Sequence, residues 1–180
     1  EASKYAAYLL PFAAGGFLLY LFKPKQRKRT ESIYTHALNA MVRGDTRTAL
    51  KHLRDVVKQD TNHIDAYLQM GDILREEDNA QAAIKIHQSL TVRPNLNNEI
   101  KRDIHQSLAR DFMQIGQLNK AQREAELVLK LDRKSIWANE FLLNIFEKQR
   151  NWDQATQITK SIQTASSPLI TPESFTKVQV

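Results

Sequence analysis

The five histidines have the widest choice of chemistry in this sequence, because imidazole can bind a metal ion or exchange a proton near neutral pH. They are His36, His52, His63, His87 and His105. A helical zinc site typically needs two histidines one turn apart and a carboxylate as third ligand, and no pair here has that spacing. We therefore expect each histidine to lie on the surface or between helices. We predict no metal site and no cofactor.

Motifs for other kinds of chemistry are missing from the sequence. It contains no cysteine, which excludes disulfides, thiolate metal ligands and a cysteine nucleophile. It also lacks a glycine-rich phosphate loop, a nucleophile elbow and a dinucleotide-binding fingerprint. We predict no catalytic residue, and a protein that is not an enzyme.

The elements that carry these histidines follow an internal repeat. Four alanines recur at intervals of 34, 38 and 34 residues, which matches the 34-residue tetratricopeptide period with one insertion. These alanines are Ala49, Ala83, Ala121 and Ala155. The residue twelve positions before each alanine lies where the first helix of a repeat must let the second helix approach closely. Small residues fill three of these four places, which are Ala37, Gly71, Ala109 and Leu143.

Apolar residues recur with helical spacing around these alanines, and Gly44, Gly116 and Glu77–Asn79 mark turns. First helices are expected near Glu31–Val42, Ile64–Glu76, Asn98–Ile115 and Ser135–Gln149. Second helices are expected near Arg47–Lys58, Ala80–Val92, Leu118–Leu131 and Trp152–Thr164. A longer loop at Arg93–Asn98 accounts for the insertion. Because a helix pair cannot bury its apolar face alone, we predict an all-α tetratricopeptide-repeat solenoid of four stacked hairpins.

Aromatic residues at repeat positions are expected to pack within or between the hairpins, since aromatic side chains dominate core packing. This set is Tyr67, Phe112, Phe141, Phe146 and Trp152.

The N-terminal segment Tyr5–Phe22 has eighteen residues without a charge, just enough to cross a bilayer as a helix. Tyrosines near both ends fit the membrane interfaces. Because the positive charge follows the apolar run, a retained anchor is favoured over a cleaved signal peptide. We attribute the Gly15–Gly16 pair to the tolerance of membrane spans for glycine. The alternative is that these small residues let a neighbouring transmembrane helix approach closely. The predicted parts are an anchor at 1–22, a basic linker at 23–30, repeats at 31–164 and an extended tail at 165–180.

Most of the net charge of +6 comes from a short cluster that follows this segment. The cluster predicts a membrane-surface contact through Lys23, Lys25, Arg27, Lys28 and Arg29. By the positive-inside rule, the N-terminus faces outward and the repeats lie in the cytoplasm. The remainder sums to +1, so we expect no basic stripe on the repeats and no nucleic-acid partner.

The inward face of the first helices predicts a groove for a protein partner. Its mixture of apolar and charged side chains suits an amphipathic helix or an extended peptide. The predicted groove residues are Tyr34, Leu38, Met41, Leu68, Asp72, Arg75, Gln106, Arg110, Met113, Trp137, Glu140 and Asn144.

Two stretches carry a family resemblance: GDILREEDNAQAAIKIHQSL at Gly71–Leu90 and LARDFMQIGQLNKAQREAE at Leu108–Glu126. With the anchor and basic flank, they resemble the N-terminal part of the lipopolysaccharide assembly protein B family. The resemblance implies a single-pass protein of the bacterial inner membrane that acts as an adaptor in regulated proteolysis balancing lipopolysaccharide synthesis. The family continues into further repeats and a cysteine-rich metal domain. We therefore expect either a fragment of such a protein or a shorter relative.

Two functional hypotheses remain open. The chain is either a membrane-anchored scaffold or adaptor that binds protein partners reversibly, or a structural subunit or assembly factor of a membrane complex. A permanent subunit should expose more apolar surface, and the mean hydropathy of −0.50 favours the adaptor.

Overall fold

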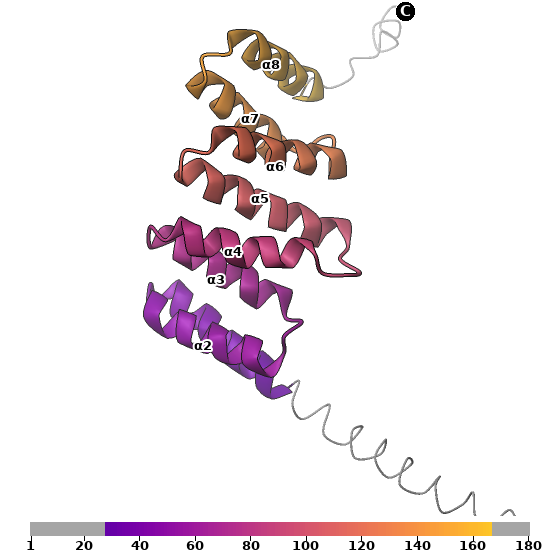
Figure 1. Cartoon of the computed structure of the whole chain (residues 1–180). Helices are drawn as coiled ribbons and strands as arrows, with labels where there is room; N and C mark the ends of the chain where they lie inside the picture. The colour runs from indigo at the N-terminus through magenta and orange to yellow at the C-terminus, as the bar shows by residue number, and fades with distance from the viewer. Residues whose placement is uncertain (1–27, 167–180) are drawn as a thin grey trace, which may run out of the picture. The chain divides into compact units, whose positions relative to one another are not determined.

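The computed structural model describes residues 28–166 of the chain (Figure 1). The predicted anchor at 1–22, linker residues 23–27 and tail residues 167–180 lie outside this part. Within the described range, no helix is both long enough and apolar enough to cross a membrane.

The described residues form eight helices and no strand, which confirms the all-α prediction. The first helix covers residues 28–42 and carries no label in Figure 1. The others are α2 (Thr46–Gln59), α3 (Ile64–Glu76), α4 (Ala80–Thr91), α5 (Asn98–Gln114), α6 (Leu118–Leu131), α7 (Ile136–Lys148) and α8 (Trp152–Ser166). The seven labelled helices begin and end within two residues of their predicted limits. The first begins earlier than Glu31, because residues 28–30 are already helical and Thr30 is buried.

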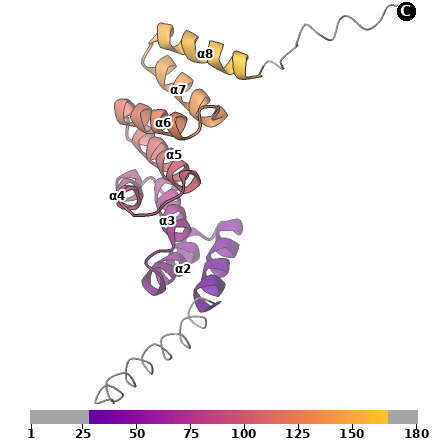
Figure 2. The same cartoon turned by 90° about the vertical axis from the view of Figure 1, so that its right-hand side faces the viewer.

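The chain divides into two compact units, one ending at Ile86 and the other beginning at His87, so the boundary falls inside α4. In the first unit, α2 packs against α3. In the second, α6 packs against α5 and α7, and α8 packs against α7. Figures 1 and 2 show α5 with α6 and α7 with α8 as neighbouring helices joined by short turns.

Three of the first helices start with the same cap. The side chains of His63, Asn97 and Ser135 each accept a hydrogen bond from the backbone N–H three residues later. Such a bond satisfies one of the N–H groups that a helix start leaves without a partner in the helix. Each cap follows the preceding repeat alanine by 14 residues, but Asn97 precedes Ala121 by 24 residues, whereas His63 precedes Ala83 by 20. The four-residue insertion therefore lengthens α5, which has 17 residues, and the prediction that the loop at Arg93–Asn98 accounts for it is wrong.

The turn inside each hairpin also repeats. Gly44, Asp78, Gly116 and Arg150 all have positive φ, between 56° and 74°. In each case the following residue donates its backbone N–H to a carbonyl five residues earlier, at 2.8–2.9 Å. This is the Schellman end of a helix, for which glycine is the natural residue. Glycine stands at two of the four positions, and Asp78 and Arg150 accept the same strained conformation.

The four repeat alanines pack in the core, as the period predicts. Ala49, Ala83 and Ala121 are completely buried, and Ala155 is 7% exposed. Among the partner positions, Ala37, Gly71 and Ala109 are buried, whereas Leu143 is only half-buried. The three small residues therefore lie in the buried interior, as the expectation of close helix contact requires.

One of the aromatic residues predicted for the core lies on the surface. Phe112 and Phe146 are buried and Tyr67 and Phe141 are half-buried, but Trp152 is 62% exposed. Trp152 is the first residue of α8. Side chains in a helix lean toward its N-terminus, so a side chain at the first helical position has no preceding turn of its own helix to cover.

Candidate functional site: the first-helix face

Half of the predicted groove residues lie in the first unit, on the helix of residues 28–42 and on α3. Tyr34 and Met41 are half-buried against a core cluster of Ala37, Leu53 and their neighbours. Leu38 is 37% exposed, whereas Leu68 is only 8% exposed. Leu68 therefore belongs to the core more than to a binding surface.

Tyr34 contacts the start of the next first helix. Its ring centroid lies 4.5 Å from that of His63, whose Nδ1 caps α3. Burial raises the pKa of Tyr34 above its ordinary value of 10.0, and the negative charge of Asp65 adds to the rise. The phenol is thus neutral at physiological pH, and it links the two first helices of this unit.

Two charged groove residues of the first unit pair with each other. Arg75 donates from Nη1 to Oδ1 of Asp72 at 2.6 Å, one turn apart on α3. Their side chains are 13% and 25% exposed, so the pair is only partly open to solvent. Charge on this face is therefore largely balanced within α3.

In the second unit, two predicted groove residues from different helices meet. The guanidinium carbon of Arg110 on α5 lies 5.1 Å from the centre of the Trp137 ring on α7. The Trp137 ring stacks on Phe141, one turn further along α7, with centroids 4.8 Å apart and an interplanar angle of 24°. We call Arg110, Trp137 and Phe141 the aromatic platform. All three are half-buried, so part of each remains open to contact.

The other predicted residues of this unit lie along the same two helices. Gln106 and Met113 on α5 are half-buried, and Glu140 and Asn144 on α7 are exposed. The Nζ of Lys148 lies 3.8 Å from the Sδ of Met113, a second contact between α5 and α7. The first helices of this unit thus carry apolar, cationic and anionic groups beside the platform.

Only part of the predicted membrane-surface cluster lies in the described range. Lys28 and Arg29 are exposed at the start of the first helix. Lys23, Lys25 and Arg27 lie outside the described residues.

The sequence did not reveal a buried ionisable pair between α4 and α5. The Nδ1 of His87 lies 2.6 Å from Oδ2 of Asp111, and both side chains are completely buried. The pattern does contain a signal: His87 follows the core residue Ala83 by four positions and precedes Leu90 by three, which places it on the buried face of α4. Sequence spacing could not show that a carboxylate would meet it.

The remaining histidines have separate surroundings. His105 on α5 contacts Glu124 on α6 at 2.7 Å in a half-buried pair. The rings of His36 and His52 lie 6.0 Å apart, between the first helix and α2. Within residues 28–166, no three His, Asp or Glu side chains gather in a group that could hold a metal ion.

Comparisons with known proteins agree with this fold. No protein-family model matches the chain. The chain is 26% identical over 160 residues to lipopolysaccharide assembly protein B of Escherichia coli strain K12, and 27% identical over 171 residues to the Haemophilus influenzae protein of that name.

This chain resembles lipopolysaccharide assembly protein B. In both comparisons the match covers 86% of the chain, which confirms the resemblance inferred from the sequence. The chain spans only 41–42% of the length of these curated relatives.

Solved structures share the fold. A crystal structure of MamA superposes with a TM-score of 0.67 at 22% identity, covering 76% of this chain and 77% of the other. The structure of YrrB, described as a tetratricopeptide-repeat protein with an unusual peptide-binding site, gives 0.61 at 14% identity, covering 76% and 69%. The chain therefore has a tetratricopeptide-type fold.

Proposed function

We propose that this chain is a non-catalytic scaffold or adaptor, held at the bacterial inner membrane by residues 1–22, whose first-helix face binds a protein partner in the cytoplasm. The aromatic platform carries the proposal. Tryptophan and arginine are enriched among the residues that dominate binding energy at protein interfaces, and here a half-buried tryptophan has an arginine against its ring.

The charge distribution favours an amphipathic helix or an extended peptide as the bound segment. Apolar surface at Trp137, Phe141 and Met113 offers anchors. Exposed Glu140 and half-buried Arg110 on neighbouring helices provide opposite charges that would fix the direction of the segment. The resemblance to lipopolysaccharide assembly protein B supports a role in controlling lipopolysaccharide assembly.

A reversible adaptor is favoured over a permanent subunit. The large hydrophobic side chains exposed in the described part of the chain are few, and only Leu38 and Val42 share a helix; the others are Val92, Ile136 and Trp152. Permanent interfaces bury larger and more apolar surfaces, comparable to a domain core cut in half.

The experiment is co-purification of partners from detergent-solubilised membranes, with the full chain as bait. Trp137→Ala and Arg110→Glu should each weaken capture of the wild-type partner set by about tenfold or more, the usual loss when a central aromatic or arginine is removed. Two matched controls lie outside the platform: exposed Trp152 on α8 and exposed Arg123 on α6.

Trp152→Ala and Arg123→Glu should leave capture unchanged. Equal loss from the controls and the platform variants would point to general destabilisation. Full capture by both platform variants would show that recognition lies elsewhere in the chain, and the platform would then have no binding role.

A further inference from the structure

The exposed face of α2 carries a basic stripe, contrary to the expectation that the repeats have none. Arg47, Lys51, Arg54 and Lys58 follow one another at intervals of four, three and four residues, and all are exposed. At 3.6 residues per turn they fall within about 60° of one another around the helix. Ala49, Leu50, Leu53 and Val56 form the buried side of the same helix.

The net charge summed over the sequence did not reveal this stripe, because a basic segment is followed by an acidic one. Residues 28–59 contain seven basic and three acidic residues, a balance of +4, whereas residues 60–86 contain two basic and six acidic residues, a balance of −4. The two segments cancel when they are summed. Folding separates them, because the basic residues of α2 share one face of one helix.

Acidic side chains of the same hairpin neutralise this stripe only slightly. Asp55 lies 3.9 Å from Lys58, with side chains 42% and 75% exposed, a geometry that contributes little in water. Asp45 and Asp60 lie at the two ends of α2, where they accept backbone hydrogen bonds from Thr48 and Asn62, and the charge of Asp45 offsets part of that of Arg47. With Glu31 also counted, residues 28–59 keep a balance of +4.

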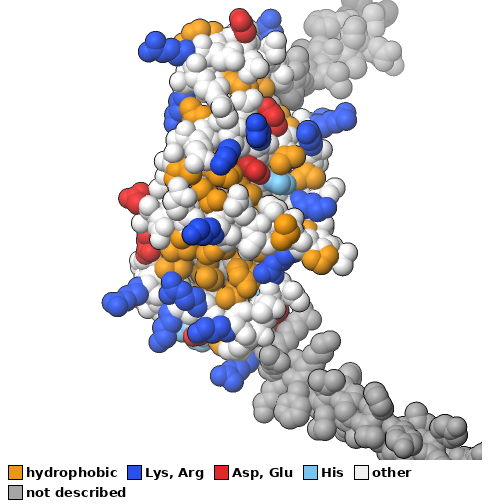
Figure 3. Space-filling model, in the orientation of Figure 1, with side chains coloured by type: hydrophobic (Ala, Val, Ile, Leu, Met, Phe, Trp, Pro, Cys, Tyr) orange, Lys and Arg blue, Asp and Glu red, His pale blue; other side chains and the backbone are white. Residues whose placement is uncertain are grey.

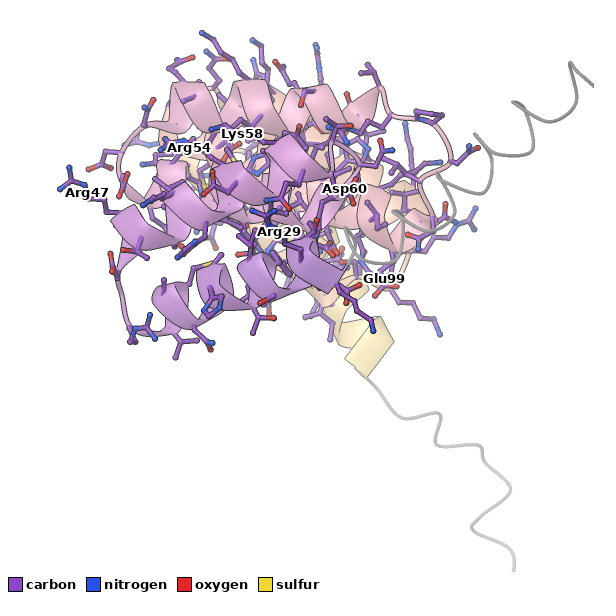
Figure 4. The ribbon with its side chains drawn as sticks, turned by 90° about the horizontal axis from the view of Figure 1, so that it is seen from below. Arg29, Arg47, Arg54, Lys58, Asp60 and Glu99 are labelled. Atoms are coloured by element: carbon purple, nitrogen blue, oxygen red, sulfur yellow. The ribbon has the colours of Figure 1, made fainter. Side chains whose placement is uncertain are left out.

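The first hairpin therefore presents a cationic surface. Figure 3 shows Lys and Arg side chains gathered over this hairpin, around α2. Figure 4 looks onto it and labels Arg29, from the first helix, together with Arg47, Arg54 and Lys58 from α2.

We propose that the α2 stripe binds the anionic headgroups of a lipid surface. Two observations support this occupant. The stripe is positively charged, as a surface that binds anionic headgroups must be. Along the sequence, the stripe comes after the basic cluster of residues 23–29, which itself comes after the uncharged segment of residues 5–22. Basic residues near an anionic membrane surface are attracted without needing a fixed pairing geometry, which suits a row of long exposed side chains.

A nucleic acid is the less suitable occupant. Proteins that bind single strands combine basic residues with aromatic side chains on which bases stack. The α2 sequence, TRTALKHLRDVVKQ, contains no Phe, Tyr or Trp.

The test is site-resolved lysine acylation of the full chain, read by mass spectrometry. The protein is mixed with vesicles of phosphatidylcholine alone, or of phosphatidylcholine with phosphatidylglycerol. Lys51 and Lys58 should be labelled at least about threefold more slowly with the anionic vesicles only, since one basic residue near such a surface changes partitioning by about fivefold. Lys85 on α4 and Lys130 on α6, both exposed, serve as internal references and should not change. High salt should abolish the protection, because it screens exposed charges.

A variant separates the stripe from the upstream cluster. Arg47→Gln with Arg54→Gln should remove most of the protection of Lys51 and Lys58, whereas the matched pair Arg123→Gln with Arg133→Gln, two exposed residues in α6 and in the turn after it, should not. Circular dichroism checks that the helices are retained.

Unchanged labelling of the stripe with anionic vesicles would overturn the proposal. Protection by a single-stranded RNA oligonucleotide and not by vesicles would also overturn it, in favour of nucleic-acid binding. Partner capture through the aromatic platform is measured separately and does not depend on this result.

Discussion

Arg110 of α5 lies against the ring face of Trp137 of α7, with 5.1 Å between the guanidinium carbon and the ring centroid. Because the two residues are 27 positions apart and come from successive first helices, their contact joins two repeats. The contacts of the indole ring with Arg110 and Phe141 restrict its orientation, which would reduce the ordering cost of the proposed binding.

Arg110 and Trp137 should therefore be energetically coupled. In a double-mutant cycle of Arg110→Ala and Trp137→Ala, we expect a coupling of about 0.5–1 kcal/mol in the free energy of urea unfolding, typical of partly exposed cation–π pairs. The cycle of Arg123→Ala with Trp137→Ala is the control, and it should be additive. Additivity in both cycles would show that the Arg110–Trp137 contact contributes nothing to stability.

The His87–Asp111 pair should be the most sensitive polar contact in the second unit. Asp111→Ala removes a fully buried carboxylate and its 2.6 Å contact with His87, so it should lower the free energy of unfolding by about 3–5 kcal/mol. His105→Ala is the comparison, and it should cost less, about 1–2 kcal/mol, because His105 and Glu124 are each 19% exposed and water can replace part of the lost contact. Similar losses for the two variants, measured by urea unfolding, would contradict this account.

Helix α6 starts without the side-chain cap seen at other helices. Gln117 occupies the N-cap position and makes no capping hydrogen bond, whereas Asp45, at the same place two repeats earlier, accepts one from Thr48. Gln117→Asn should stabilise the chain by about 0.5–1 kcal/mol in thermal or urea unfolding. The shorter asparagine side chain can accept a hydrogen bond from a backbone N–H in the first turn of α6. Gln117→Ala should be neutral. Equal stability of the Asn and Ala variants would show that the cap cannot form at this turn.

The hairpin turns give a test of backbone strain. A methyl group added at Gly116 would meet no atom within 4 Å, so any cost of Gly116→Ala arises from its φ of +73°. We expect that change to destabilise the chain by about 1 kcal/mol, and the reverse change, Arg150→Gly, to stabilise it by a few tenths. Melting temperatures of the two variants should move in opposite directions. Movement in the same direction would contradict the equivalence of the two turns.

The cap of α2 should make stability depend on pH. The pKa of Asp45 lies below its ordinary value of 3.8, chiefly because Thr48 donates hydrogen bonds to the carboxylate, with Arg43 and Arg47 adding to the effect. A lowered pKa in the folded state means that the stabilisation is complete above pH 3.8 and is lost as the pH falls through the folded value. The melting-temperature advantage of the wild type over Asp45→Asn should therefore be constant at neutral pH and should shrink in acid. An advantage that persists unchanged at pH 2 would show that charge is not involved.

Much of the fold could be predicted because its signals are local. The spacing of Ala49, Ala83, Ala121 and Ala155 reflects close helix contacts that recur in every repeat, and the turns at Gly44 and Gly116 reflect φ values that glycine adopts without strain. Helix limits followed from the same periodicity, because caps and turns act within four or five residues of the helix end.

The tertiary structure decided the contacts between residues far apart in the chain. Nothing in the sequence paired His87 with Asp111, or Arg110 with Trp137, because both contacts depend on the packing of one helix against another. Burial at a helix end was likewise undetermined, and Trp152, expected in the core, proved exposed. The charge of the α2 face was also misjudged, since a sum over the sequence ignores which face of a helix each charged side chain lies on.

By itself the sequence determined the repeat, the helices and the absence of cysteine chemistry, which depend on local geometry and composition. Only packing decided which side chains meet and which remain on the surface, because those distances are set by how the helices dock against one another.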